Sequence, residues 1–202
     1  MKGNKNMIIG LTGPSGSGKS TICEVAEELG YCVINADKVG HSIIKKGKDA
    51  YTEIVGAFGE GILLPSGEID RKVLGGIVFS DTDKLAMLNN ITHKRISEAI
   101  EKQIALCDNK VTVLEAAVLF ESGMNKICDY VIAVTAPFEE RIRRICERDG
   151  ITAEKAALRL RSQQNDEFYS SRANKAICNN GDVSSLKSVV RAVFEEVCNG
   201  KI

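Results

Sequence analysis

The sequence predicts a three-layer α/β fold, in which a doubly wound parallel sheet of about five strands is covered by helices on both faces. Short apolar segments alternate along the chain with longer segments of helical periodicity. Each short segment is apolar throughout, which is typical of strands that are buried on both faces. The chain has 202 residues, which is enough for one domain with insertions and a sizeable core.

The expected strands are short and lie far apart in the sequence. They comprise residues 7–12, 32–35, 111–114, 130–134 and 176–178. The last is the weakest, because only Ala-Ile-Cys carries it. Between the second and third strands, residues 38–108 have mostly helical periodicity, interrupted by turn-forming stretches at 58–61 and 65–68.

Helices are expected between the remaining strands. The first covers residues 19–29 and ends at Gly30. Pro137 opens a helix that ends near Gly150, and Thr152 caps another that runs to about Phe168. The final helix has an apolar face made of Leu186, Val189, Val190, Val193, Phe194 and Val197.

The composition excludes several classes of protein. Lys+Arg and Asp+Glu number 27 each, so neither a nucleic-acid partner nor a membrane surface is favoured. No apolar segment is long enough to span a membrane, and residues 1–12 do not fit a signal peptide. The seven cysteines include no Cys-x-x-Cys pair, so we expect reduced thiols in a cytoplasmic protein rather than disulfides or a zinc site.

One segment carries a specific motif. Residues 13–20, Gly-Pro-Ser-Gly-Ser-Gly-Lys-Ser, fit G-x-x-x-x-G-K-[ST] between an expected strand and an expected helix. Glycines let successive N–H groups turn toward a phosphate, and the start of a helix adds partial positive charge. Lys19 supplies a full charge to the β- and γ-phosphates, and the Ser20 hydroxyl can ligate Mg²⁺. The expected phosphate-binding residues are Gly13, Gly16, Ser17, Gly18, Lys19, Ser20 and Thr21.

The rest of the sequence favours a small-molecule kinase among the proteins that use nucleoside triphosphates. A GTPase needs Asn/Thr-Lys-x-Asp, and the nearest segment, 125–129, has one residue too many. A kinase needs a carboxylate that accepts the proton of the acceptor hydroxyl. Asp37 follows the second strand, at the sheet edge where ligands bind in such folds. A helix N-cap is an equally good interpretation of this aspartate.

Seven segments together resemble the dephospho-coenzyme A kinase family. In chain order they are GPSGSGKST, EELGYCVINAD followed by His41, SGEIDRKVLGGIVF, LNNITHKRI, AVLFESG, RICERDGITAEKAALRLRSQ and AICNNG. They span almost the whole chain. The resemblance implies a single P-loop kinase domain with a core of 7–37, 109–138 and 173–202, a helical acceptor-binding insertion at 38–108 and a helical lid at 139–172.

By this resemblance, the reaction is the phosphorylation by ATP, with Mg²⁺, of the ribose 3′-hydroxyl of dephospho-coenzyme A, the last step of coenzyme A biosynthesis. Asp37 corresponds to the proposed base of the family. The implied acceptor-binding residues are Asp37, His41, Arg71, His93 and Glu121. We expect a monomer or weak homo-oligomer without a nucleic-acid or membrane partner.

Three arginines of the expected lid share one helix face. Arg141, Arg144 and Arg148 stand at i, i+3 and i+7. Guanidinium groups can meet phosphoryl oxygens when a lid closes, although ion pairs with neighbouring glutamates are the simpler interpretation. The resemblance favours Arg144 for a catalytic phosphate contact and leaves Arg141 at the surface.

Two further pairs of residues have open interpretations. Asn179 and Asn180 are expected either at the adenine edge of the nucleotide or in the turn before Gly181. His41 follows Asp37 by four residues and either orients it on one helix face or is a surface histidine.

Some positions differ from the family pattern. Asn35 stands where the family has an acidic residue, and Glu115 is a candidate substitute for it near Mg²⁺. Pro14 has no N–H to offer a phosphate. These differences keep two alternatives open, a kinase for a nucleoside or nucleoside monophosphate, and a nucleotide-binding regulatory protein without turnover.

Overall fold

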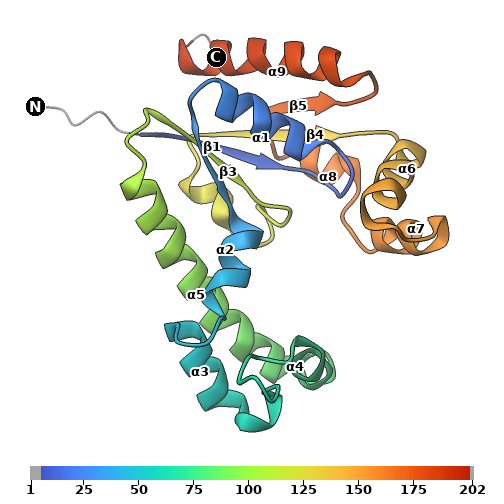
Figure 1. Cartoon of the computed structure of the whole chain (residues 1–202). Coiled ribbons are helices and arrows are strands. Elements are labelled where there is room, and N and C mark those ends of the chain that lie inside the picture. The colour runs from blue at the N-terminus through green and yellow to red at the C-terminus, as the bar shows by residue number, and fades with distance from the viewer. Residues whose placement is uncertain (1–5, 201–202) are drawn as a thin grey trace, which may run out of the picture. The chain divides into compact units, whose positions relative to one another are not determined.

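The computed structural model describes residues 6–200 as strands alternating with helices (Figure 1). In chain order the elements are β1 Met7–Thr12, α1 Lys19–Glu28, β2 Cys32–Asn35, α2 Ala36–Ile43, α3 Asp49–Phe58, η1 Glu60–Ile62, α4 Arg71–Val78, α5 Thr82–Leu106, β3 Val111–Glu115, η2 Met124–Ile127, β4 Tyr130–Thr135, α6 Phe138–Asp149, α7 Ala153–Arg161, α8 Asp166–Ser170, β5 Lys175–Cys178 and α9 Val183–Cys198. Residues 201–202, the end of the last expected core segment, lie outside the described part.

The sheet places the segment after β1 at a point where ligands typically bind. Its strand order is β2-β3-β1-β4-β5. Strand β1 pairs in parallel with both β3 and β4, and β4 pairs in parallel with β5. The strand order therefore reverses at β1, and the loop that follows it lies at the topological switch point. The expected α/β fold with a five-stranded parallel sheet is confirmed.

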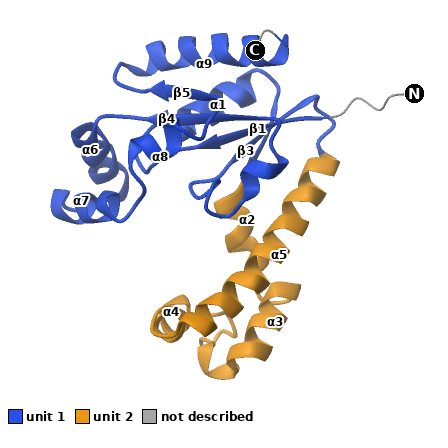
Figure 2. Ribbon diagram, turned by 180° about the vertical axis from the view of Figure 1, so that it is seen from behind, with its two compact units in different colours: residues 1–34, 107–202 blue, residues 35–106 orange. Residues whose placement is uncertain are grey.

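The chain divides into two compact units, which Figure 2 colours separately. The first, residues 1–34 and 107–202, contains the sheet, whose core packs against α1 and α9 through residues such as Ile22, Val25 and Phe194. The second, residues 35–106, has its own core around Ile54, Ile62 and Leu74.

The helix expected from Thr152 to Phe168 is two helices. Helix α7 begins after Thr152, whose side chain accepts a hydrogen bond from the N–H of Lys155, as predicted. It ends at Arg161, and α8 begins at Asp166. The Asn165 side chain accepts a hydrogen bond from the N–H of Phe168 at 2.8 Å, so it caps α8 and separates the two helices.

The expectation of reduced thiols is wrong for one pair of cysteines. Cys32 in β2 and Cys107 before β3 form a disulfide, with their Cα atoms 6.2 Å apart. They are 75 positions apart in the sequence, so their spacing gave no signal of the pair. Among the described residues, five other cysteines carry free thiols: Cys23, Cys128, Cys146, Cys178 and Cys198.

None of the helices within residues 6–200 is both long enough and apolar enough to cross a bilayer.

Candidate active site

The glycines of the loop after β1 have backbone conformations that other residues rarely adopt. The φ angles of Gly13, Gly16 and Gly18 are 140°, 75° and 108°. A Cβ atom on Gly13 would lie 2.0 Å from the carbonyl oxygen of Val134, and one on Gly18 would lie 2.4 Å from Nδ2 of Asn179. Glycine is therefore required at both positions by conformation and by space.

The loop ends at the N-terminus of α1, which offers main-chain N–H groups. The helix begins at Lys19, and its N-cap, Gly18, has no side chain to accept their hydrogen bonds. The first turn carries no acidic residue. Ser20 is exposed there and Thr21 is half-buried. Such a helix start favours an anion, because neither a capping side chain nor an acidic residue of the first turn offsets the partial positive charge of the helix.

The Lys19 ammonium group lies against the leading half of the same loop. Its Nζ donates hydrogen bonds to the carbonyl oxygens of Gly13 at 2.8 Å and Pro14 at 3.2 Å. These contacts hold a full positive charge beside the N–H groups of the helix start. The loop thus combines the two features that a polyphosphate requires.

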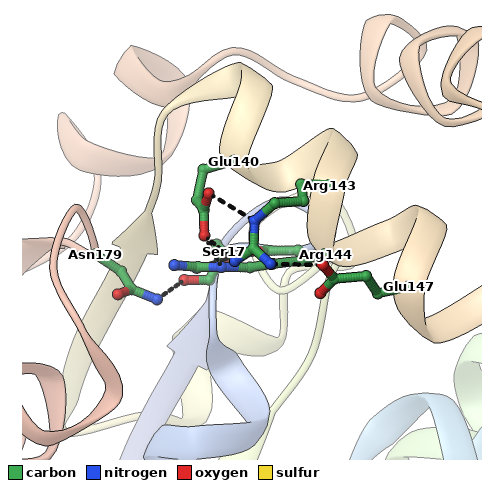
Figure 3. Close-up of polar contacts among 7 residues, drawn as sticks. Ser17, Glu140, Arg143, Arg144, Glu147 and Asn179 are labelled. Atoms are coloured by element: carbon green, nitrogen blue, oxygen red, sulfur yellow. Dashed lines mark hydrogen bonds and ion pairs between the residues drawn. The ribbon is translucent and has the colours of Figure 1, made fainter.

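Arg144 of α6 contacts this loop. Figure 3 draws Arg144 with its neighbours Glu140, Arg143 and Glu147. Its Nη1 donates to the carbonyl oxygen of Gly16 at 3.2 Å, and its Nε donates to Glu140 Oε1 at 3.1 Å. Arg143 also binds Glu140 and reaches Glu147 at 2.6 Å. The hydrogen bond from Arg143 foremost, and then the charges of Arg143 and Arg144, lower the pKa of Glu140 to about 2. Glu140 therefore stays ionised and orients both guanidinium groups.

The expectation of Arg141 at the surface is wrong. Arg141 is 7% exposed and pairs with Asp166 of α8 at 3.3 Å. Its guanidinium also lies 5.7 Å from the centre of the Phe138 ring. The main chain of Arg141 packs so closely on the loop that a Cβ on Gly16 would lie 2.9 Å from its carbonyl oxygen. At Arg141, the helix face that carries the three arginines is therefore directed toward the loop and α8.

Asn179 supports the loop from the other side. Its main-chain N–H donates to the carbonyl oxygen of Thr135 at 2.7 Å. Its Nδ2 donates to the carbonyl oxygen of Ser17 at 2.8 Å, as Figure 3 shows. The residue is 6% exposed. The first bond joins the carboxyl ends of β4 and β5, and the second ties them to the loop, so Asn179 holds the loop in place.

A cavity of about 230 Å³ lies beside Asn179 and the exposed Asn180. Ile177, Leu186 and Val189 supply apolar lining, and the two asparagines supply polar groups. A flat heterocycle with polar edges fits such a lining.

Glu115 ends β3 next to the loop, opposite Leu11 of β1. The Cys23 thiol of α1 donates a long hydrogen bond to Glu115 Oε2, with 3.7 Å between sulfur and oxygen. Burial foremost, and then the charge of Glu115, raise the pKa of this thiol, so Cys23 stays protonated and neutral. Among residues 6–200, no group of three or more His, Cys, Asp and Glu side chains has the arrangement of a metal site.

The acceptor-side residues implied by the resemblance are mostly in the 35–106 unit. Asp37 and His41 are exposed one turn apart on α2, Arg71 is exposed at the start of α4, and His93 is exposed on α5. Glu121 is also exposed, but it belongs to the first unit, in the segment after β3.

The interpretation of Asp37 as a helix cap is wrong. Helix α2 begins at Ala36, and the Asn35 side chain accepts a hydrogen bond from the N–H of Lys38 at 2.7 Å. Asn35 therefore caps α2, and Asp37 lies in its first turn with an exposed carboxylate. Asn35, which stands where the family has an acidic residue, thus has a structural role as the N-cap of α2.

One loop contact comes from a residue that sequence reasoning did not single out. Gln163, just after α7, makes two hydrogen bonds with Ser15. Gln163 follows the end of a helix, where neither periodicity nor charge marks it. The closing glutamine of the segment RICERDGITAEKAALRLRSQ was its one signal in the sequence.

Comparisons with known proteins agree with this geometry. Residues 7–185 match the model of a family described as dephospho-CoA kinase. A protein of this name from Moorella thermoacetica is 39% identical over 194 residues, which cover 94% of this chain and 92% of the relative.

Two solved structures match over nearly their full length. The dephospho-CoA kinase from Campylobacter jejuni is 32% identical, with a TM-score of 0.71, and the match covers 98% of this chain and all of that one. The crystal structure of TT1252 from Thermus thermophilus is 29% identical, with a TM-score of 0.80, over 95% of this chain and 98% of that one. With its phosphate loop, its five-stranded sheet and these relatives, the chain belongs to the dephospho-CoA kinase family, a family of ATP-dependent transferases.

Proposed function

We propose that this chain transfers a phosphoryl group from ATP to the ribose 3′-hydroxyl of dephospho-coenzyme A, giving coenzyme A and ADP. The observation that carries the proposal is the loop 13–18 at the sheet's switch point, in a chain that matches this family over residues 7–185. The loop leads into the start of α1, which has neither a capping side chain nor an acidic residue in its first turn. The loop supports binding of the donor, and the family match supports the choice of acceptor.

The residues of the first unit fit ATP with Mg²⁺. The N–H groups at the start of α1 and the Lys19 ammonium group would hold the phosphates, and the cavity beside Asn179 and Asn180 would hold the adenine. Mg²⁺ commonly keeps its waters and takes few protein ligands, which fits the Ser20 hydroxyl and the nearby Glu115 better than a cage of carboxylates. When bound, the ion would neutralise charge on the phosphates.

Asp37 is our candidate for the base that accepts the proton of the acceptor hydroxyl. Its carboxylate is exposed in the first turn of α2, and Asn35 supplies the cap of that helix in its place. We assign acceptor binding to Asp37 together with His41, Arg71, His93 and Glu121.

Arg144 is our candidate for a contact with the transferred phosphoryl group. Its guanidinium already reaches the loop at the Gly16 carbonyl oxygen, and Glu140 orients it. A small rotation of the side chain would exchange that neutral acceptor for an anionic oxygen, which forms a stronger hydrogen bond.

The test is an ADP-release assay with alternative acceptors. We expect release with dephospho-coenzyme A and Mg²⁺, and little with nucleosides or nucleoside monophosphates. ADP release with a nucleoside or a nucleoside monophosphate, but not with dephospho-coenzyme A, would identify a kinase for another acceptor. ATP binding without turnover on any acceptor would identify a regulatory nucleotide-binding protein.

We further propose that the protein acts in the cytoplasm as a monomer or weak homo-oligomer. The match of residues 7–185 to the dephospho-CoA kinase family supports the first point. Sedimentation at several protein concentrations measures the second, and a stable large assembly would contradict it.

A further inference from the structure

Gln163 uses both ends of its side-chain amide on a single residue of the phosphate loop. Its Oε1 accepts a hydrogen bond from the main-chain N–H of Ser15 at 2.9 Å, and its Nε2 donates to the Ser15 hydroxyl at 3.0 Å. The two residues are 148 positions apart, and Gln163 is half-buried. This contact therefore joins the loop to the segment between α7 and α8.

Ser15 occupies a corner of a turn inside the loop. The N–H of Ser17 donates to the carbonyl oxygen of Pro14 at 3.3 Å, and Gly16 has a φ of 75°. Such a turn places Ser15 at its second position and a glycine of positive φ at its third. The peptide bond between Ser15 and Gly16 carries the Gly16 N–H. A restraint on Ser15 therefore limits how that N–H can rotate.

Lys19 holds the leading half of the loop through the carbonyl oxygens of Gly13 and Pro14, but it does not contact Ser15 or Gly16 in the hydrogen bonds described above. Pro14 has no N–H, and the N–H of Ser15 is engaged by Gln163. Arg144 holds the same turn at the Gly16 carbonyl oxygen. The turn is thus fixed on both sides of the Ser15–Gly16 peptide by residues of the 139–172 segment.

We propose that Gln163 is a positioning residue that fixes the phosphate loop in the conformation that binds ATP; this rests on the proposed binding of ATP at that loop. The side chain acts through Ser15 and does not itself contact the nucleotide. A loop that is already ordered loses less conformational entropy on binding, so the contact contributes to ATP affinity more than to the chemical step.

The variant Gln163→Met tests this proposal, because methionine has a similar length but no amide. Loss of two neutral hydrogen bonds should raise the Kd for ATP, measured by titration calorimetry without acceptor, between about five-fold and about thirty-fold. The KM for ATP should rise in parallel, while kcat and the KM for the acceptor stay within about two-fold, which is the pattern expected when binding alone is weakened.

Gln164→Met is the matched control, since Gln164 is the exposed neighbour of Gln163. It should leave the Kd for ATP unchanged. Equal effects of the two variants, or an unchanged Kd in Gln163→Met, would overturn the proposal. A loss of kcat together with both KM values and a lowered Tm would assign Gln163 a role in the folding of the segment instead, and would overturn it too.

Ser15→Ala provides a second route if Gln163→Met does not fold. This variant removes only the hydroxyl that accepts from Nε2, and should raise the Kd for ATP by about two-fold to five-fold. An unchanged Kd would contradict the proposal. The wild-type protein distinguishes failure of the proposed function from failure of the role of Gln163. If the wild type does not bind ATP, the proposed function is refuted. If the wild type binds ATP normally and the variants bind it equally well, only the role of Gln163 is refuted.

Discussion

The phosphate loop is held by buried residues, whereas the candidate residues of the 35–106 unit lie on exposed helix surfaces. Around the loop, Ser17, Arg141 and Asn179 are each less than a tenth exposed. Contacts from α6, from the α7–α8 segment and from the residue after β5 hold the loop backbone. In the 35–106 unit, Asp37 and His93 are exposed on helix surfaces. The difference indicates that the donor site is formed by the fold itself, whereas the acceptor residues remain accessible to a substrate.

The largest effect is expected at the centre of the donor site. Lys19→Ala removes the ammonium group that lies against the loop. We expect turnover, measured by ADP release, to fall by about 10³-fold or more, because a charge that stabilises the transferred phosphoryl group is lost. Full activity in this variant would mean that the nucleotide binds elsewhere and would remove the basis of the comparison.

The next effect is expected on the acceptor side. Asp37→Asn keeps the shape of the side chain but removes the proposed base, so kcat should fall by about 10²-fold or more while the Kd for ATP stays near normal. Asp49→Asn is the matched control, because Asp49 is an exposed aspartate in the first turn of α3. Undiminished turnover in Asp37→Asn would exclude this residue from the mechanism.

A smaller effect is expected from the arginine that contacts the loop. Arg144→Ala should lower kcat between about ten-fold and about one hundred-fold, the range for one hydrogen bond to a charged group. Arg143→Ala serves as the control, because Arg143 binds the same Glu140 without contacting Gly16 in the structure. Similar kcat values for Arg144→Ala and Arg143→Ala would show that Arg144 acts only through its ion pair within α6.

The smallest effect concerns stability. The pKa of Glu140 is about 2, below its ordinary 4.5, so the stabilisation from its ion pairs is complete above about pH 4.5 and is lost as the pH falls through 2. Because these side chains are partly exposed to solvent, Glu140→Gln should lower Tm by about 2 °C or less at pH 7. Thermal unfolding at pH 7 and pH 3 measures the difference, which should be smaller at pH 3. If the Tm difference between the wild type and Glu140→Gln is the same at both pH values, it comes from packing and not from the charge of Glu140.

The fold could be predicted because its signals are local. Buried parallel strands are apolar throughout, and β1 and β2 begin and end where the sequence indicated. The glycine motif lies between a strand and a helix, as its chemistry requires. The break between α7 and α8 was missed because Asn165 is also compatible with a continuing helix, and its role as a cap depends on the chain turning there.

The site could be predicted less completely, because several of its contacts join distant segments. Spacing placed Arg141 and Arg144 on one helix face but could not tell what that face contacts. Gln163 reaches Ser15 across 148 positions, and nothing local marks such a contact. The sequence does not show whether Asn35 or Asp37 caps α2, because either side chain can cap a helix.

The bond between Cys32 and Cys107 has a consequence for the connectivity of the molecule. It joins the two places where the polypeptide leaves and re-enters the sheet-containing unit, and residues 35–106 lie between them. A protease that cuts once within those residues therefore leaves the two fragments covalently attached. They would migrate as one species on a gel without reductant and separate only after dithiothreitol is added.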